Sequence, residues 1–169
     1  ESYLRAVAVE TLNTARPPFD NVNVRRAVAY ALPYDDMFKA ALFGRGSPLF
    51  GATWADGKPT SGAYPIPQPV KLDLDKAKEY LKAAGMPDGF STTFSFNVGQ
   101  ASTAEPMAAL VKESLAKIGI KVDIQKLPDA QMSTQINEKK LPFFTEGIVA
   151  WLPSTDYFYR NFYTGNQRW

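Results

Sequence analysis

The sequence predicts an α/β fold in which helices flank a central mixed, mostly parallel sheet. Helical and strand-like segments alternate along most of the 169 residues, which is typical of parallel strands joined by helices. Apolar residues make up 45% of the chain and charged residues 21%, an ordinary balance for a globular protein. The first strand-like segment is apolar on both faces, which suits a buried strand of a mixed or parallel sheet.

The N-terminal third predicts one strand and two helices. Residues 3–11 form the strand, and Pro17 and Pro18 then make a rigid turn. Asn21 or Asn23 can cap the next helix by accepting a free backbone N–H. That helix carries one apolar stripe at helical spacing, formed by Val24, Ala27, Val28, Ala31 and Leu32. Pro33 interrupts it, and a second helix runs on to Gly44.

The middle of the chain opens with a long loop over residues 44–70 that is rich in Pro and Gly. Asp73 or Asp75 caps the helix that follows, and Gly85 ends it. Alternating apolar residues over 91–98 predict a half-buried strand. Ser102 and Glu105 have the spacing of a capping box, so we expect a helix from there to Gly119.

The last third repeats the alternation. Residues 120–125 predict a strand, 130–140 a polar helix, 143–151 another strand, and 156–163 an aromatic-rich helix or turn.

Composition excludes several classes of function. The chain has no cysteine and no histidine, which removes disulfides, the common catalytic dyads and the usual transition-metal ligands. Its net charge of +2 is scattered, whereas a nucleic-acid interface needs a clustered basic face. The paired aspartates at 35–36 and at 73 and 75 lie at helix starts, where they have a structural role. We therefore predict no enzyme, no catalytic residue, no metal site, no cofactor and no nucleic-acid partner.

The C-terminal residues predict a binding surface. Aromatic side chains crowd residues 151–169, together with one acid, Asp156, and Arg160. Aromatic walls with a few polar groups are the usual chemistry of a small-molecule cleft. Arg160 can pair with a ligand carboxylate through two hydrogen bonds. The residues that we expect to face the cleft are Trp151, Ser154, Thr155, Asp156, Tyr157 and Arg160.

Four segments resemble a known family in the family's own order. They are RPPFDNVNVRRAVAYALPYDDM at 16–37, DKAKEYLKAAG at 75–85 followed by Gly89 and Phe90, AALVKESLAKIGIKV at 108–122, and IVAWLPSTDYF at 148–158. Together they are similar to family 5 of the extracellular solute-binding proteins, the dipeptide, oligopeptide and nickel-type receptors of ABC importers.

The resemblance implies a lobe of the type II periplasmic binding protein fold. Residues 1–169 would form a single lobe, the second and C-terminal one, as a fragment of a two-lobe protein whose N-terminal lobe is missing. Asn13 and Thr14, just past the first strand, would lie near the hinge between the lobes. The protein would be periplasmic, or tethered outside the membrane of a Gram-positive cell, and would dock on a membrane permease.

The same resemblance bears on the ligand. The peptide receptors carry an Asp three residues after the tryptophan and can carry a basic residue three before it, where this chain has Ser154 and Ile148. These differences favour a sugar-like or opine-like ligand, or a modified peptide, over a generic peptide.

Two other functions remain open at this stage. The lobe could be a stand-alone or fused ligand-sensing or interaction domain without transport. A hydrolase that uses Asp or Ser without His is a third possibility.

Overall fold

The computed structural model describes residues 6–42 and 70–149. Its strands are β1 (Ala6–Leu12), β2 (Ser91–Asn97), β3 (Lys121–Leu127) and β4 (Phe143–Val149). Its helices are α1 (Val22–Ala31), α2 (Tyr34–Leu42), α3 (Leu74–Ala83), α4 (Ala101–Ala116) and α5 (Asp129–Asn137), with a short 3₁₀ turn η1 (Val98–Gln100). The predicted loop over 44–70, apart from Val70, and the predicted helix over 156–163 lie outside the described residues.

The sheet is mixed and mostly parallel, as predicted. Its strand order is β1-β4-β2-β3. β2 runs parallel to both β3 and β4, whereas β1 pairs antiparallel with β4 from Ala6 opposite Val149 to Leu12 opposite Phe143. The carboxyl ends of β2, β3 and β4 therefore share one edge of the sheet.

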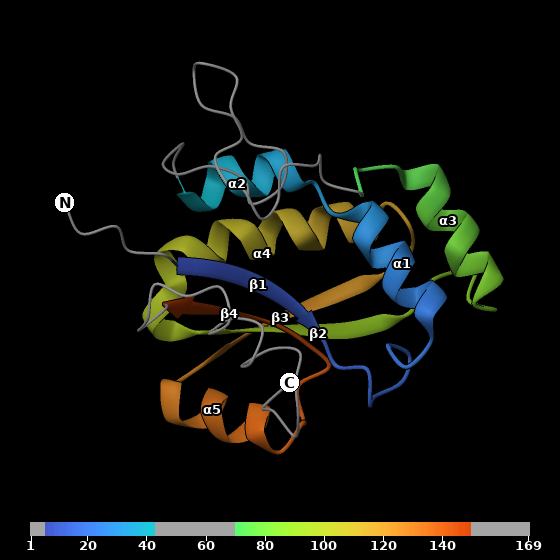
Figure 1. Cartoon of the computed structure of the whole chain (residues 1–169). Coiled ribbons are helices and arrows are strands. Elements are labelled where there is room, and N and C mark those ends of the chain that lie inside the picture. The colour runs from blue at the N-terminus through green and yellow to red at the C-terminus, as the bar shows by residue number, and fades with distance from the viewer. Residues whose placement is uncertain (1–5, 43–69, 150–169) are drawn as a thin grey trace, which may run out of the picture.

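Helices cover the two faces of the sheet unequally (Figure 1). α1, α2, α3 and α4 lie on one face, and α5 lies on the other. Two buried clusters match these layers: a large one under α1–α4, and a smaller one of Leu127, Met132, Ile136, Leu141 and Phe144 under α5. Consecutive β4 residues separate the clusters, since Phe143 packs in the first and Phe144 in the second.

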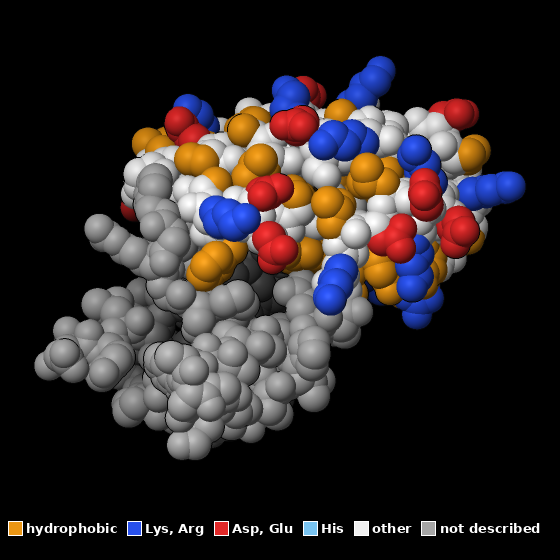
Figure 2. Space-filling model, turned by 90° about the horizontal axis from the view of Figure 1, so that it is seen from above, with side chains coloured by type: hydrophobic (Ala, Val, Ile, Leu, Met, Phe, Trp, Pro, Cys, Tyr) orange, Lys and Arg blue, Asp and Glu red, His pale blue; other side chains and the backbone are white. Residues whose placement is uncertain are grey.

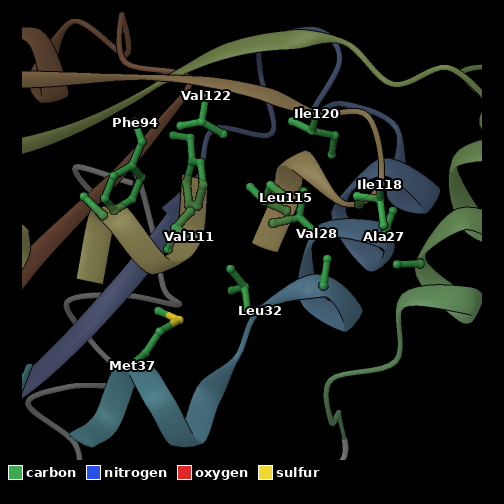
Figure 3. Packing of buried hydrophobic residues seen from close by; sticks show 14 of the residues in the cluster. Ala27, Val28, Leu32, Met37, Phe94, Val111, Leu115, Ile118, Ile120 and Val122 are labelled. Carbon is green, nitrogen blue, oxygen red and sulfur yellow. The ribbon is translucent and has the colours of Figure 1, made fainter. Parts of the chain in front are cut away.

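The first helix follows its predicted pattern. Asn21 is the N-cap, and its side chain accepts a hydrogen bond from the Asn23 backbone N–H at 2.9 Å. All five residues of the predicted apolar stripe are buried. Figure 3 shows Ala27, Val28 and Leu32 beside side chains of α2, α4 and the sheet. The stripe is therefore a packing surface of the fold.

The start of α4 differs from the prediction. The helix begins at Ala101, so Ser102 and Glu105 lie inside it and form no capping box. The Glu105 carboxylate instead pairs with Lys126 of β3. The turn η1 runs directly into α4, and it is capped by Asn97, whose side chain accepts a hydrogen bond from the Gly99 N–H at 2.6 Å.

The strands β2 and β3 also depart from simple alternation. At the centre of β2, Phe94, Ser95 and Phe96 are all buried, because α5 covers the face opposite α4. Val98 belongs to η1 and is 50% exposed. Ile124 is 38% exposed, because β3 is an edge strand with a neighbour on one side only.

Outside the core, α1 and α3 are joined by an aromatic and cationic cluster. The rings of Tyr30 and Tyr80 stack at a centroid distance of 5.6 Å, with Arg26 over Tyr80 and Lys76 over Tyr30. The hydrogen bond to Tyr30 raises the pKa of Lys76. Elsewhere on this side of the molecule, acidic and basic side chains are interspersed (Figure 2).

Candidate functional site

The chain diverges to opposite faces of the sheet at the carboxyl ends of β2 and β3. These strands are parallel neighbours. The chain leaves β2 toward α4 on one face, and it leaves β3 toward α5 on the other. In open α/β sheets the two diverging connections leave a crevice at such a switch point, and ligands bind there. We call this place the switch point, and residues 97–100 and 128–129 border it.

The residues that border the switch point combine apolar and polar groups. Val98, which follows β2, exposes half of its surface. The Asn97 side chain holds Gly99 through the cap described above. Asp129, at the first position of α5, is exposed and turns its carboxylate toward Gly99. An apolar surface beside a few directed polar groups is suited to holding a small solute.

The six predicted cleft residues lie outside the described part of the chain. They are Trp151, Ser154, Thr155, Asp156, Tyr157 and Arg160. β4 is described to its end at Val149, two residues before Trp151. Because β4 is parallel to β2, the chain leaves β4 at the same edge of the sheet as the switch point. Their role in binding stays a prediction.

The predicted hinge residues lie at the opposite end of β1 from this edge. Asn13 follows β1 where that strand pairs with the start of β4. Its side-chain amide donates to the carbonyl oxygens of Lys139 and Leu141 at 2.8 and 3.1 Å, and its backbone N–H donates to Pro142. Thr14 is exposed beside it. Asn13 thus ties the end of β1 to the connection between α5 and β4, and the hinge role stays a prediction.

Sequence reasoning missed Asn97, Gly99 and Asp129. Each residue lies at or after the end of a predicted strand. Which strand ends lie side by side, and so could form a site together, is known only from the strand order. The alternation of strands and helices was the available signal, because parallel strands bring their carboxyl ends to one edge.

A second hollow runs along the outer side of α5 and has a volume of about 550 Å³. Most of its lining residues are of polar type, and they include Thr134, Gln135 and the ion pair of Glu138 with Lys140. The hollow is open, and the ion pair neutralises its charged groups, so we place no ligand there.

The described residues, 6–42 and 70–149, hold neither a candidate metal site nor a candidate membrane span. No three acidic side chains gather there as a metal site would require. No helix in these ranges has both the length and the apolar character needed to cross a bilayer.

Comparison with known families gives one match over almost the whole chain. The family model described as bacterial extracellular solute-binding proteins, family 5 Middle, matches residues 5–169. Among curated proteins, the glutathione-binding protein GsiB of Salmonella choleraesuis strain SC-B67 is 37% identical over 130 residues. Those residues are 76% of this chain and 24% of GsiB, so the chain spans about a quarter of that relative's length.

Solved structures agree in fold. The periplasmic binding protein DppA of Helicobacter pylori, in complex with the peptide STSA, superposes with a TM-score of 0.78 at 30% identity, over 92% of this chain and 29% of DppA. The binding protein AgaA of A. tumefaciens R10, in complex with agropinic acid, gives a TM-score of 0.73 at 30% identity, over 96% of this chain and 33% of AgaA. The fold is therefore that of type II periplasmic binding proteins, as the sequence predicted.

Proposed function

This chain belongs to family 5 of the bacterial extracellular solute-binding proteins, and from that membership we propose that it forms one lobe of the substrate-binding component of an ABC importer. The whole protein would capture a small solute between two lobes outside the cytoplasm and deliver it to a membrane permease. The residues described here would supply one wall of the cleft, and the N-terminal lobe would supply the other. The protein would bind its solute without transforming it.

The switch point is the observation that carries this proposal. It lies at the edge where β2, β3 and β4 all end, so it can be combined with side chains that follow β4. Trp151 and Tyr157 would stack on the ligand, while Asp156 and Arg160 would pair with its charged groups. Ser154 and Thr155 would donate hydrogen bonds. The six residues predicted to face the cleft and the border of the switch point would thus act on one ligand.

The ligand that we propose is a small peptide-like or opine-like solute. Three similar proteins support this class: GsiB is named for glutathione, DppA was solved with a peptide, and AgaA was solved with agropinic acid. Binding would favour a closed arrangement of the two lobes by contacting both at once.

Calorimetry on the full two-lobe protein tests the function. Glutathione, the peptide STSA and agropinic acid serve as probes, and we expect at least one to bind. Trp151→Ala should then abolish the binding, because the ring supplies the largest apolar contact. Tyr80→Ala is the matched control, since it removes an aromatic ring from the stack between α1 and α3. Unchanged affinity in Trp151→Ala would overturn the cleft assignment.

A further inference from the structure

We propose that Asn13 and Arg16 form a latch that holds the C-terminal end of α5 in place and, through the helix, the side of the switch point that α5 borders. The latch follows β1, at the opposite edge of the sheet from the switch point. Its effect on ligand binding rests on the proposed function, whereas its effect on α5 does not.

The C-terminal end of α5 contains a residue in an unfavourable backbone conformation. Lys139 has a φ angle of 53°, and among the described residues it is the one non-glycine residue with a positive φ. Its N–H donates to the Ile136 carbonyl, and the Lys140 N–H donates to the Gln135 carbonyl, both at 2.8 Å. Helices commonly end in this pair of hydrogen bonds, with glycine at the left-handed position. A lysine there is strained, because its Cβ atom crowds the following carbonyl oxygen, so surrounding groups must hold it in this conformation.

The segment after β1 supplies such groups. The Lys139 carbonyl oxygen accepts hydrogen bonds from Asn13 Nδ2 and from Arg16 Nε, each at 2.8 Å. These two donors match the two lone pairs of that oxygen. The Arg16 guanidinium also places a positive charge at the C-terminal end of α5, where a cation is favourable and where the last helical turn has no basic residue. The carbonyl of the strained residue is thus fixed from outside the helix.

Asn13 uses both polar groups of its side chain in this arrangement. The same Nδ2 group also donates to the Leu141 carbonyl at 3.1 Å, and Oδ1 accepts a hydrogen bond from the Ala15 N–H at 3.1 Å. The Asn13 backbone N–H donates to the Pro142 carbonyl at 2.9 Å. One asparagine therefore binds three carbonyl groups of the connection between α5 and β4. An aspartate would keep the acceptor for Ala15 and lose both side-chain donors.

α5 is a short helix whose own sequence supports it weakly. It has nine residues, and a helix of that length is marginal without tertiary packing. Its N-cap is Pro128, whose side chain has no polar atom to accept a backbone N–H. Its buried residues are Met132 and Ile136, which belong to the smaller of the two clusters. Support from the latch should therefore matter to its position.

The two ends of α5 connect the latch to the switch point. The helix ends beside Lys139, and it begins about 13 Å away along its axis, at residues 128–129. These residues border the switch point. Because so short a helix is stiff, holding its C-terminal end also fixes the place of its N-terminal end.

Hydrogen exchange on the full two-lobe protein tests the latch. In Asn13→Asp we expect the backbone amides of residues 136–140 to exchange about tenfold faster or more, because two hydrogen bonds to the connection are lost. Arg16→Ala should accelerate the same amides by a smaller factor, because it removes one exposed hydrogen bond. The amides of α4, which lies on the other face of the sheet, should keep the parent rate and serve as the internal reference.

A second substitution, at Lys139, separates the latch from a general loss of stability. Lys139→Gly removes the strain, because glycine adopts the left-handed conformation freely, so it should return Asn13→Asp to about the parent exchange rate. Lys139→Ala is the matched control, since it shortens the same side chain but keeps the strain, and it should restore nothing. Restoration by both substitutions or by neither would overturn the latch, and so would a parent exchange rate in Asn13→Asp alone.

Calorimetry with STSA and glutathione tests the effect on binding. Asn13→Asp should weaken the affinity for whichever probe the parent protein binds by about threefold or more, and added Lys139→Gly should restore it. Faster exchange in α5 with unchanged affinity would overturn the connection between the latch and the switch point. A parent protein that binds neither probe would count against the peptide-like ligand class of the proposed function, while the exchange rates would still decide whether the latch exists.

Discussion

At the scale of single residues, two glycines let the segments that precede β2 and β3 pack closely against each other. Gly89 and Gly119 precede these strands and adopt φ angles of +79° and +84°. They also touch: a Cβ atom on Gly89 would overlap the Gly119 carbonyl group, and one on Gly119 would lie 2.6 Å from the Asp88 oxygen. Sequence reasoning assigned Gly119 to the end of a helix, which is confirmed. The close approach needed the tertiary structure.

Substitution of Gly119 tests both requirements for glycine at this position, the positive φ angle and the close approach to Asp88. Gly119→Ala should lower the free energy of unfolding by about 2–5 kcal/mol, through left-handed strain plus displaced backbone. Gly85→Ala is the matched control, because Gly85 has a φ of +77° but open space around its Cβ position. Gly85→Ala should lower the free energy of unfolding by about 1–2 kcal/mol, because it introduces the backbone strain alone. Urea denaturation measures both, and equal losses would contradict the role of the close approach.

At the scale of elements, helix stripes were predictable and one helix start was not. The buried faces of α1, α3 and α4 follow a 3.6-residue period that side-chain type alone reveals. The capping box at Ser102 and Glu105 was wrong because η1 continues into α4 without a break. Because η1 already turns the backbone from Val98 on, the capping residue is Asn97, which lies four positions before Ala101, the first residue of α4.

Alanine substitution distinguishes the two caps. Asn97→Ala should lower the free energy of unfolding by about 1 kcal/mol, since the Gly99 N–H loses its acceptor. Ser102→Ala should change it by less than about 0.5 kcal/mol, because Ser102 is an exposed residue inside a helix that alanine favours. Thermal or urea unfolding measures the difference. A larger loss for Ser102→Ala than for Asn97→Ala would restore the capping box.

At the scale of the whole molecule, strand order determines where a ligand can bind. α4 and α5 cover opposite faces of the sheet, so the chain separates after β2 and β3. Asn97, Gly99 and Asp129 meet at this point although they come from two separate connections. The resulting surface is one open wall, and in the proposed function a second lobe would supply the facing wall.

An isolated chain should therefore bind poorly. We expect the 169-residue chain to show little or no affinity for STSA or glutathione, because half of the contacts would be missing. Calorimetry on the isolated chain, with the full two-lobe protein as reference, measures this. Micromolar binding by the isolated chain would mean that one lobe suffices. A folded chain, shown by a cooperative thermal transition, is the necessary control.

The sequence by itself determined the α/β class, the order of the elements and the family, because hydrophobic period and local motifs are properties of consecutive residues. The stripe of α1 belongs to this local level and was predicted, and Asn21 and Asp73 were each predicted as one of two candidate caps. Only the tertiary structure decided the strand order, the pairing of β1 with β4 and the meeting of Gly99 with Asp129. These depend on contacts between residues far apart in the chain, which strand periodicity leaves open, since the same strands can pair in several orders.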